Sequence, residues 1–140
     1  MKRLAAFVSL AFFVLTCRAG DLTIGGGWVR YLPAGVPAGG FFKLHNAGKP
    51  TALVGASSPD YRMVMIHKTI EEGGVSRMVE VDRIDVPAGG DVVFQPGGYH
   101  LMLMHAKHDI KPGSEVTITL RFADGQTVSA RYRVRKPTAQ

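Results

Sequence analysis

The sequence predicts an all-β domain, built as an antiparallel sandwich or barrel of the immunoglobulin-like type. Short stretches rich in β-branched and aromatic residues recur along the chain, and several alternate apolar with polar residues, as in 116–120 (VTITL) and 128–134 (VSARYRV). Clusters of Gly and Pro separate these stretches and mark turns. Regular short strands with turns between them are typical of all-β folds, and no stretch has a convincing helical pattern.

We expect nine strands, which in chain order cover residues 23–31, 40–46, 52–57, 62–70, 75–86, 91–95, 99–105, 115–122 and 127–134. The tetrapeptide Pro-Ala-Gly-Gly occurs at 37–40 and again at 87–90, but its surroundings differ, which indicates a turn sequence used twice rather than a repeat. Residues 71–74 (EEGG) are the expected turn between the fourth and fifth strands.

The first 19 residues resemble a cleavable signal peptide. Two basic residues precede an apolar run at 4–15, and residues 17–19 (CRA) form a small-x-small cleavage signal. The apolar run is too short to span a bilayer as a helix. We expect cleavage near Ala19 or Gly20 and a periplasmic protein. Residues 20–136 would then form a single domain, followed by a short tail at 137–140.

The only cysteine of the chain, Cys17, lies in this signal segment. Residues 14–17 (VLTC) loosely resemble a lipoprotein processing site, so lipid anchoring at Cys17 is the alternative, although Thr16 fits that pattern poorly. Standard cleavage leaves a chain without thiols, which excludes disulfide frameworks, CxxC redox chemistry and thiolate zinc sites. It also excludes a blue-copper centre, because such a centre needs a Cys thiolate.

The charge of the chain is mildly basic and dispersed. Removing residues 1–19 takes away Lys2, Arg3 and Arg18 and no acidic residue, so the formal net charge falls from +6 to +3. Nucleic-acid binding would need a denser basic patch and a recognisable module, so we expect none. The basic residues of 131–136 (RYRVRK) alternate and would share one solvated face of a strand, which is compatible with an acidic protein partner.

Four residues have a spacing that points to a metal site: His67, Met78, His100 and Met102, which read H-x10-M-x21-H-x-M. Thioether sulfur prefers Cu(I), imidazole suits copper among other metals, and hard cations prefer neither. Thioethers also provide soft ligands in oxidising compartments, where thiols are lost to disulfides. The spacing therefore predicts a Cu(I) site outside the cytoplasm.

Strand geometry explains part of this spacing. His100 and Met102 are two residues apart, so in a strand their side chains share one face, with Cα atoms about 6.6 Å apart. A hairpin loop centred between Glu72 and Gly73 would place His67 directly opposite Met78, whereas a loop on residues 73–74 alone would not. We expect the former register, with two hairpins meeting at one end of the sandwich.

Five further residues lie near this motif: Met63, Met65, Met104, His105 and His108. The three methionines lie an even number of residues from a motif residue, so in a strand they would share its face. They are either a Met-rich rim with spare ligands or, as we prefer, soft packing around the site. The two histidines are either a second metal site or, as we prefer, exposed loop residues.

Taken with its surroundings, the motif resembles the PCu(A)C family of periplasmic copper chaperones. The resemblance rests on residues 28–30 (WVR), 87–90 (PAGG), 96–104 (PGGYHLMLM) and 122–125 (FADG), together with the four spaced ligands. It implies a cupredoxin-like Greek-key β-fold that binds one Cu(I) per chain through His67, Met78, His100 and Met102. Some members add a His- and Met-rich tail that binds Cu(II); residues 136–140 contain neither residue type.

In that family copper is passed toward the binuclear centre of cytochrome c oxidase. The resemblance therefore implies two protein partners, the copper-bearing oxidase subunit and a Sco-type thioredoxin-like chaperone. We expect a monomeric carrier that is not an enzyme. The alternatives are a copper storage or resistance protein without an oxidase target, a copper oxidase or electron-transfer protein, and a structural adhesion-like β-domain.

Overall fold

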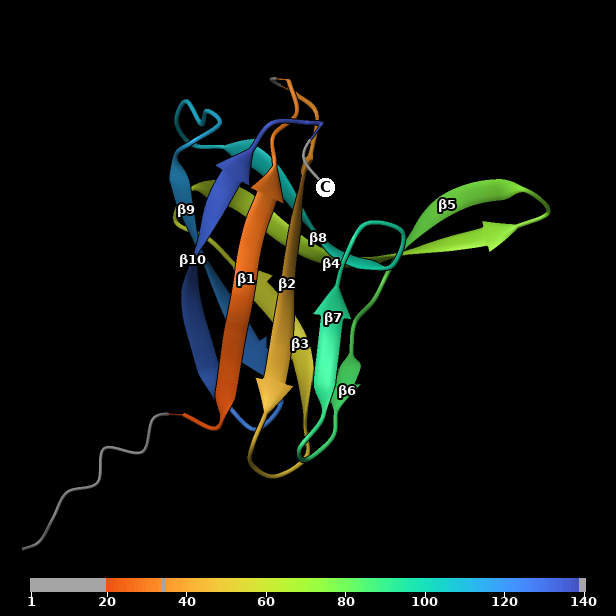
Figure 1. The fold of residues 1–140 in the computed structure, drawn as a ribbon, viewed down its shortest axis with the longest axis vertical. Coiled ribbons are helices and arrows are strands. Elements are labelled where there is room, and N and C mark those ends of the chain that lie inside the picture. The colour runs from red at the N-terminus through yellow and green to blue at the C-terminus, as the bar shows by residue number, and fades with distance from the viewer. Residues whose placement is uncertain (1–19, 34, 139–140) are drawn as a thin grey trace, which may run out of the picture.

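The computed structural model describes residues 20–33 and 35–138, and the regular structure within them consists of strands alone (Figure 1). There are ten: β1 (Leu22–Arg30), β2 (Ala38–Asn46), β3 (Thr51–Ser57), β4 (Tyr61–Glu72), β5 (Val75–Glu80), β6 (Ile84–Val86), β7 (Asp91–Phe94), β8 (Tyr99–Ala106), β9 (Glu115–Phe122) and β10 (Thr127–Arg135). The all-β prediction is confirmed. The predicted signal segment and the last two residues of the tail lie outside the described residues.

The expected strand at 75–86 is wrong as a single element, because it is two strands with different neighbours. Residues 75–80 pair with β4, whereas residues 84–86 pair with β3 on the opposite edge of the sheet. Between them the Val81 N–H donates to the Ile66 carbonyl at 2.9 Å, the last backbone contact with β4 before the chain leaves that strand. The other eight strands lie where the sequence predicts them, within a few residues at each end.

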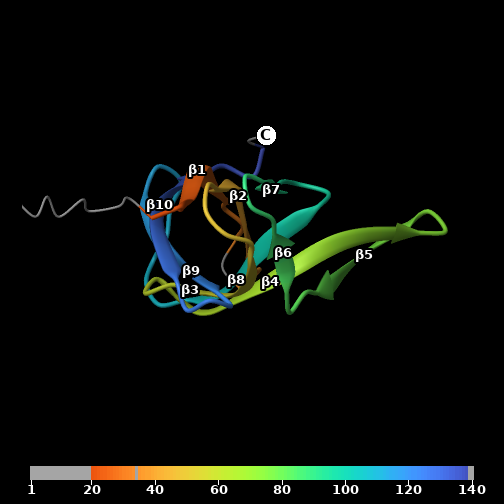
Figure 2. The same cartoon turned by 90° about the horizontal axis from the view of Figure 1, so that it is seen from below.

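The ten strands form one sheet with the order β5-β4-β8-β7-β2-β1-β10-β9-β3-β6, and β8 also pairs with β2. Figure 2 shows this sheet curling around the molecule, so that its inner face encloses a core. Most pairs are antiparallel; β1 and β10 run parallel, as do β7 and β8 at their single pairing. Because neighbours in the sheet are often distant in sequence, β8 lies between β4 and β2, and this placement builds the candidate site.

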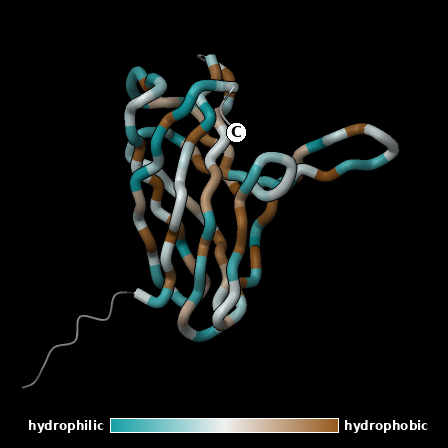
Figure 3. Tube along the Cα trace, viewed as in Figure 1, coloured by the Kyte–Doolittle hydropathy of each residue, from teal (hydrophilic) through white to brown (hydrophobic). Residues whose placement is uncertain are grey.

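The core follows from the alternation seen in the sequence. On β9, Val116, Ile118 and Leu120 are buried, whereas the residues between them face outward. Phe42 lies near the centre of the core and stacks on Phe94 with ring centroids 4.3 Å apart. Each such side chain contributes about 1.5–3 kcal/mol when it is removed from water. Figure 3 shows the same alternation of apolar and polar segments along the strands of the body.

The alternating basic residues at the end of the chain behave as predicted. Tyr132 and Val134 are buried, and Arg131, Arg133 and Arg135 are exposed on the outer face of β10. The prediction of one solvated basic face is therefore confirmed.

The outer half of β4 and the whole of β5 form a hairpin arm that projects from the body (Figures 1 and 2). Nearly all of β5 is exposed. Glu71 and Glu72, which we expected in a turn, are the last residues of β4, and the loop consists of Gly73 and Gly74. No helix long and apolar enough to cross a membrane occurs in residues 20–33 or 35–138.

Candidate metal centre

Two of the predicted ligands, His67 on β4 and His100 on β8, face each other across neighbouring strands. They are directly opposed in the antiparallel register, so their side chains share one face of the sheet. Their ring centroids are 5.8 Å apart and the ring planes meet at 63°. The direct pairing of β4 with β8 differs from the expected meeting of two hairpins, and it places the two imidazoles on directly opposed residues.

His100 has one ring nitrogen fixed by the backbone and the other left open. The side chain is 7% exposed, and Nδ1 lies 3.2 Å from the carbonyl oxygen of Gly98. A carbonyl oxygen only accepts, so Nδ1 carries the hydrogen and Nε2 carries the lone pair. Nε2 is buried and has no hydrogen-bond partner. Metal-ligating histidines are held in this way, with the second nitrogen donating to an oxygen.

His67 is half-buried, and both of its ring nitrogens are buried without a hydrogen-bond partner. Burial lowers the pKa of His67, the neighbouring His100 lowers it further, and Glu80 opposes this by raising it. Glu80 is the residue directly opposite His67 on β5. The lowered pKa favours the neutral imidazole, which is the form that binds a metal.

Met102 lies on the same face as the two histidines. It is half-buried and directly opposes Met65 on β4 and Gly39 on β2. At Gly39 an added Cβ would lie 3.1 Å from the Phe41 ring, so the aromatic side chain covers the position beside Met102. Met102 therefore lies between Gly39 on the β2 side and Met65 on the β4 side, two residues from His100 on its own strand.

Met78 is on the arm, in a register that differs from the expected one. The strands pair Met78 with Thr69 and Glu80 with His67, so the expected opposition of His67 and Met78 is wrong. The cause is the loop: Gly73 and Gly74 have φ of 59° and 79°, a two-residue turn that requires positive φ at both positions. The shift moves Met78 two residues along the arm but keeps it on the same face as His67.

A cavity of about 150 Å³ joins three of the predicted ligands. Met78, His100 and Met102 line it together with Thr69 from β4. Strands β1 and β2 and the segment between them contribute further residues: Arg30, Leu32, Pro37, Ala38, Gly39 and Phe41. His67 is not among the lining residues and reaches the group through its ring contact with His100. Met78 is 59% exposed and is the outermost of the four.

The remaining histidines form pairs with carboxylates or stand exposed. His45 Nδ1 lies 2.6 Å from an Asp91 carboxylate oxygen, and His108 Nε2 lies 2.7 Å from Asp60. The hydrogen bond to Asp60 raises the pKa of His108, helped by the Asp109 carbonyl. His105 is exposed with φ of 56°. Within the described residues no three His, Cys, Asp or Glu side chains gather as a metal site.

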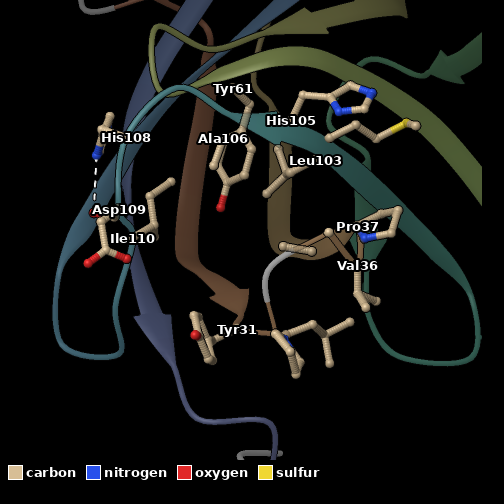
Figure 4. A pocket seen from close by; sticks show the side chains of 15 residues that line it. Tyr31, Val36, Pro37, Tyr61, Leu103, His105, Ala106, His108, Asp109 and Ile110 are labelled. Atoms are coloured by element: carbon tan, nitrogen blue, oxygen red, sulfur yellow. Dashed lines mark hydrogen bonds between the residues drawn. The ribbon is translucent and has the colours of Figure 1, made fainter.

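A larger cavity of about 420 Å³ lies at the far end of β8 (Figure 4). Tyr61, His105, His108 and Ile110 are among its lining residues, and Figure 4 shows His108 in contact with the carbonyl of Asp109, at 3.3 Å from Nδ1. None of the four predicted ligands lines this cavity.

Solved structures with a similar architecture include PCuAC domains. The apo PCuAC domain of PmoF2 is 28% identical, with a TM-score of 0.69 over 86% of this chain and 94% of that domain. The copper-bound PCuAC domain of PmoF2 is 26% identical, with a TM-score of 0.69 over 84% and 95%. Cu(I)-bound DR1885 of Deinococcus radiodurans is 31% identical, with a TM-score of 0.65 over 85% and 79%. The fold is thus the cupredoxin-like β-fold of the PCuAC type.

Comparison of sequences identifies the family of the chain. Residues 22–134 match the family model described as "Putative lipoprotein LpqE-like", and the chain belongs to this family. A relative from Leifsonia xyli subsp. xyli, named a lipoprotein, is 34% identical over 79% of this chain and 67% of its own length. An uncharacterized protein of Rickettsia prowazekii is 38% identical over 60% of this chain, which spans about half (47%) of that relative.

Proposed function

We propose that this protein is an extracytoplasmic copper chaperone that holds one Cu(I) through His67, Met78, His100 and Met102. The observation that carries the proposal is the opposed histidine pair, which has three buried ring nitrogens without partners beside a thioether on the same face. The likeness to the copper-bound PmoF2 domain and to Cu(I)-bound DR1885 supports it.

The donor set fits a monovalent soft ion. Two neutral imidazoles and two thioethers add no negative charge, and their softness suits Cu(I) and disfavours hard cations. Copper is cargo here and keeps its oxidation state, so the protein is not an enzyme in this proposal. Met78 is exposed on a projecting arm and is the ligand that a partner would displace first, by exchanging one donor for another.

The proposal also includes the destination of the copper. We infer that the ion is passed toward the binuclear copper centre of cytochrome c oxidase, with its copper-bearing subunit and a Sco-type chaperone as partners. A monomer with an accessible arm suits such an exchange. The lipoprotein names among the relatives favour a location outside the cytoplasm, either free in the periplasm or anchored at Cys17.

Competition between the protein and a Cu(I) chelator such as bicinchoninate tests the site. The wild-type protein should take one Cu(I) tightly, and the Met78→Leu, Met102→Leu double variant should lose most of that affinity, because both thioethers are gone while the side-chain volume is kept. A Val93→Leu variant, changed at an exposed apolar residue on β7 that lines neither cavity, is the control. Unchanged affinity in the double variant would show that the assigned ligands are wrong.

An experiment in cells distinguishes copper delivery from copper storage. Cytochrome c oxidase activity in a deletion strain at low copper should fall and recover when copper is added, because a chaperone matters most when its cargo is scarce. Normal oxidase activity in copper-poor medium would instead favour copper storage or resistance.

A further inference from the structure

The methionines of this protein gather on one face of three neighbouring strands. The sequence has six methionines, and all five that follow Met1 lie on β4, β5 or β8. Directly opposed residues share a face, as do residues two apart along a strand, so the registers place all five beside the two histidines. No buried apolar side chain in the described part of the chain is a methionine. Core packing therefore does not account for their use.

Three of them are outside the proposed ligand set. The β4–β8 register aligns Met65 with Met102 and Met63 with Met104, in two successive cross-strand pairs next to the histidine pair. Opposed Cβ atoms are about 5 Å apart and successive pairs on one face about 7 Å apart. Methionine side chains are long and flexible, so the sulfurs of Met63, Met65 and Met104 can converge on one ion.

Their exposure argues against the packing interpretation that the sequence favoured. Met63 is 48% exposed, and Met65 and Met104 are only half-buried. On the opposite face of the same strands, Ile66 and Leu103 are buried in the core. An apolar side chain that keeps part of its surface in water gains only part of the stabilisation available from burial, and nothing in that role requires sulfur.

We propose that Met63, Met65 and Met104 form a second, weaker Cu(I) site through which the ion enters or leaves the primary set. This inference rests on the proposed function. Thioethers alone suit Cu(I), and the site is weaker because it has no imidazole. Met65 opposes Met102 directly, so the two sites meet at that pair.

Transfer along this face needs only ligand exchange. One thioether binds the ion as another leaves, copper remains Cu(I), and no electron or proton moves. Exposure increases from buried His100 in two directions, toward Met78 on the arm and toward Met63 on β4, so the ligands of a partner can reach the ion at Met63 as well. Met104 also lines the larger cavity, which opens the same end of β8 to solvent.

Methyl-labelled methionine NMR under anaerobic Cu(I) titration tests this site. The first equivalent should shift the Met78 and Met102 methyl signals, and the second should shift those of Met63, Met65 and Met104. The triple variant Met63→Leu, Met65→Leu, Met104→Leu should bind the first equivalent as the wild type does, lose the second, and release Cu(I) to bicinchoninate several-fold more slowly.

Three further variants keep the test decisive. Met63→Leu alone changes an exposed side chain, so it should fold normally and still slow the release of Cu(I), whereas Val93→Leu, at a similarly exposed residue on β7, should not. His100→Ala should lose the tight equivalent and keep the weak one.

The outcomes separate the two proposals. A wild-type protein that binds one Cu(I) and leaves the Met63, Met65 and Met104 signals unmoved overturns the second site and leaves the proposed function intact. Release rates that are the same in Met63→Leu and Val93→Leu overturn the transfer role. A wild-type protein that binds no Cu(I) tightly overturns the proposed function itself.

Discussion

At His100, the backbone decides which ring nitrogen is available to a metal. The Gly98 carbonyl fixes the Nδ1 hydrogen, and this leaves the buried Nε2 without a partner. Removing this imidazole should weaken Cu(I) binding by about 100-fold or more, since loss of the groups that merely orient a metal ligand already costs about 10–100-fold. His100→Ala is compared in a chelator competition with His45→Ala, which removes an exposed histidine paired with Asp91. Equal affinities in the two variants would exclude His100 as a ligand.

His67 gives a prediction about pH. Its pKa in the folded protein lies below the ordinary 6.5 because burial and His100 outweigh the opposing effect of Glu80. Between the folded value and 6.5 the unfolded chain binds more protons, so the contribution of His67 lowers the free energy of unfolding of the apo-protein as pH falls through that window. His67→Gln should flatten this part of the profile, measured by denaturant unfolding at a series of pH values.

The role of Glu80 in the same titration is tested separately. Glu80→Gln removes the one group that raises the pKa of His67, so ring NMR signals should report a lower pKa in this variant. Glu115→Gln, on β9, removes an acidic residue from a different strand and is the control. An unchanged His67 pKa in Glu80→Gln would mean that the cross-strand carboxylate does not act on the imidazole.

At the scale of elements, the two-glycine loop sets the position of Met78. Gly74 has φ of 79°, a conformation that costs a residue with a side chain about 1–2 kcal/mol. Gly74→Val should therefore loosen the arm and weaken Cu(I) binding, whereas Gly73→Asn should preserve both, because Asn-Gly suits this turn. Hydrogen exchange of the β5 amides and chelator competition measure the two effects. Equal Cu(I) affinities in both variants would mean that arm geometry does not position Met78.

The arm also shows what the sequence could predict and what it could not. Alternation predicted all of the expected strands except the one at 75–86, and it predicted the shared face of His100 and Met102, since period-two geometry is local. The hairpin register depends on which residues form the loop. Gly-Gly pairs favour two-residue hairpin turns, and the expected register did not take this preference into account. The pairing of β4 with β8 joins segments more than thirty residues apart, and the opposition of His67 and His100 depends on it. A pairing this distant has no local signature.

At the scale of the whole molecule, the proposed ligands join the projecting arm to the body. Met78 lies on β5, His67 on β4, and His100 and Met102 on β8, so one bound ion would tie three strands together. A ligand that binds only the folded state stabilises it in proportion to its occupancy, by about 2.7 kcal/mol at a free concentration of 100 Kd. Anaerobic thermal unfolding should show a higher midpoint with one equivalent of Cu(I), and removal of the ion with a chelator should restore the apo value.

Two controls decide what such a shift means. His100→Ala should lose the rise in midpoint, while His45→Ala, with its exposed side chain on β2, should keep it. An adhesion-like domain with a PCuAC-type fold but no metal site would melt at one temperature with or without Cu(I). An unshifted midpoint in the wild type would favour that structural role, because a single ion bound across β4, β5 and β8 cannot leave the stability of the folded state unchanged.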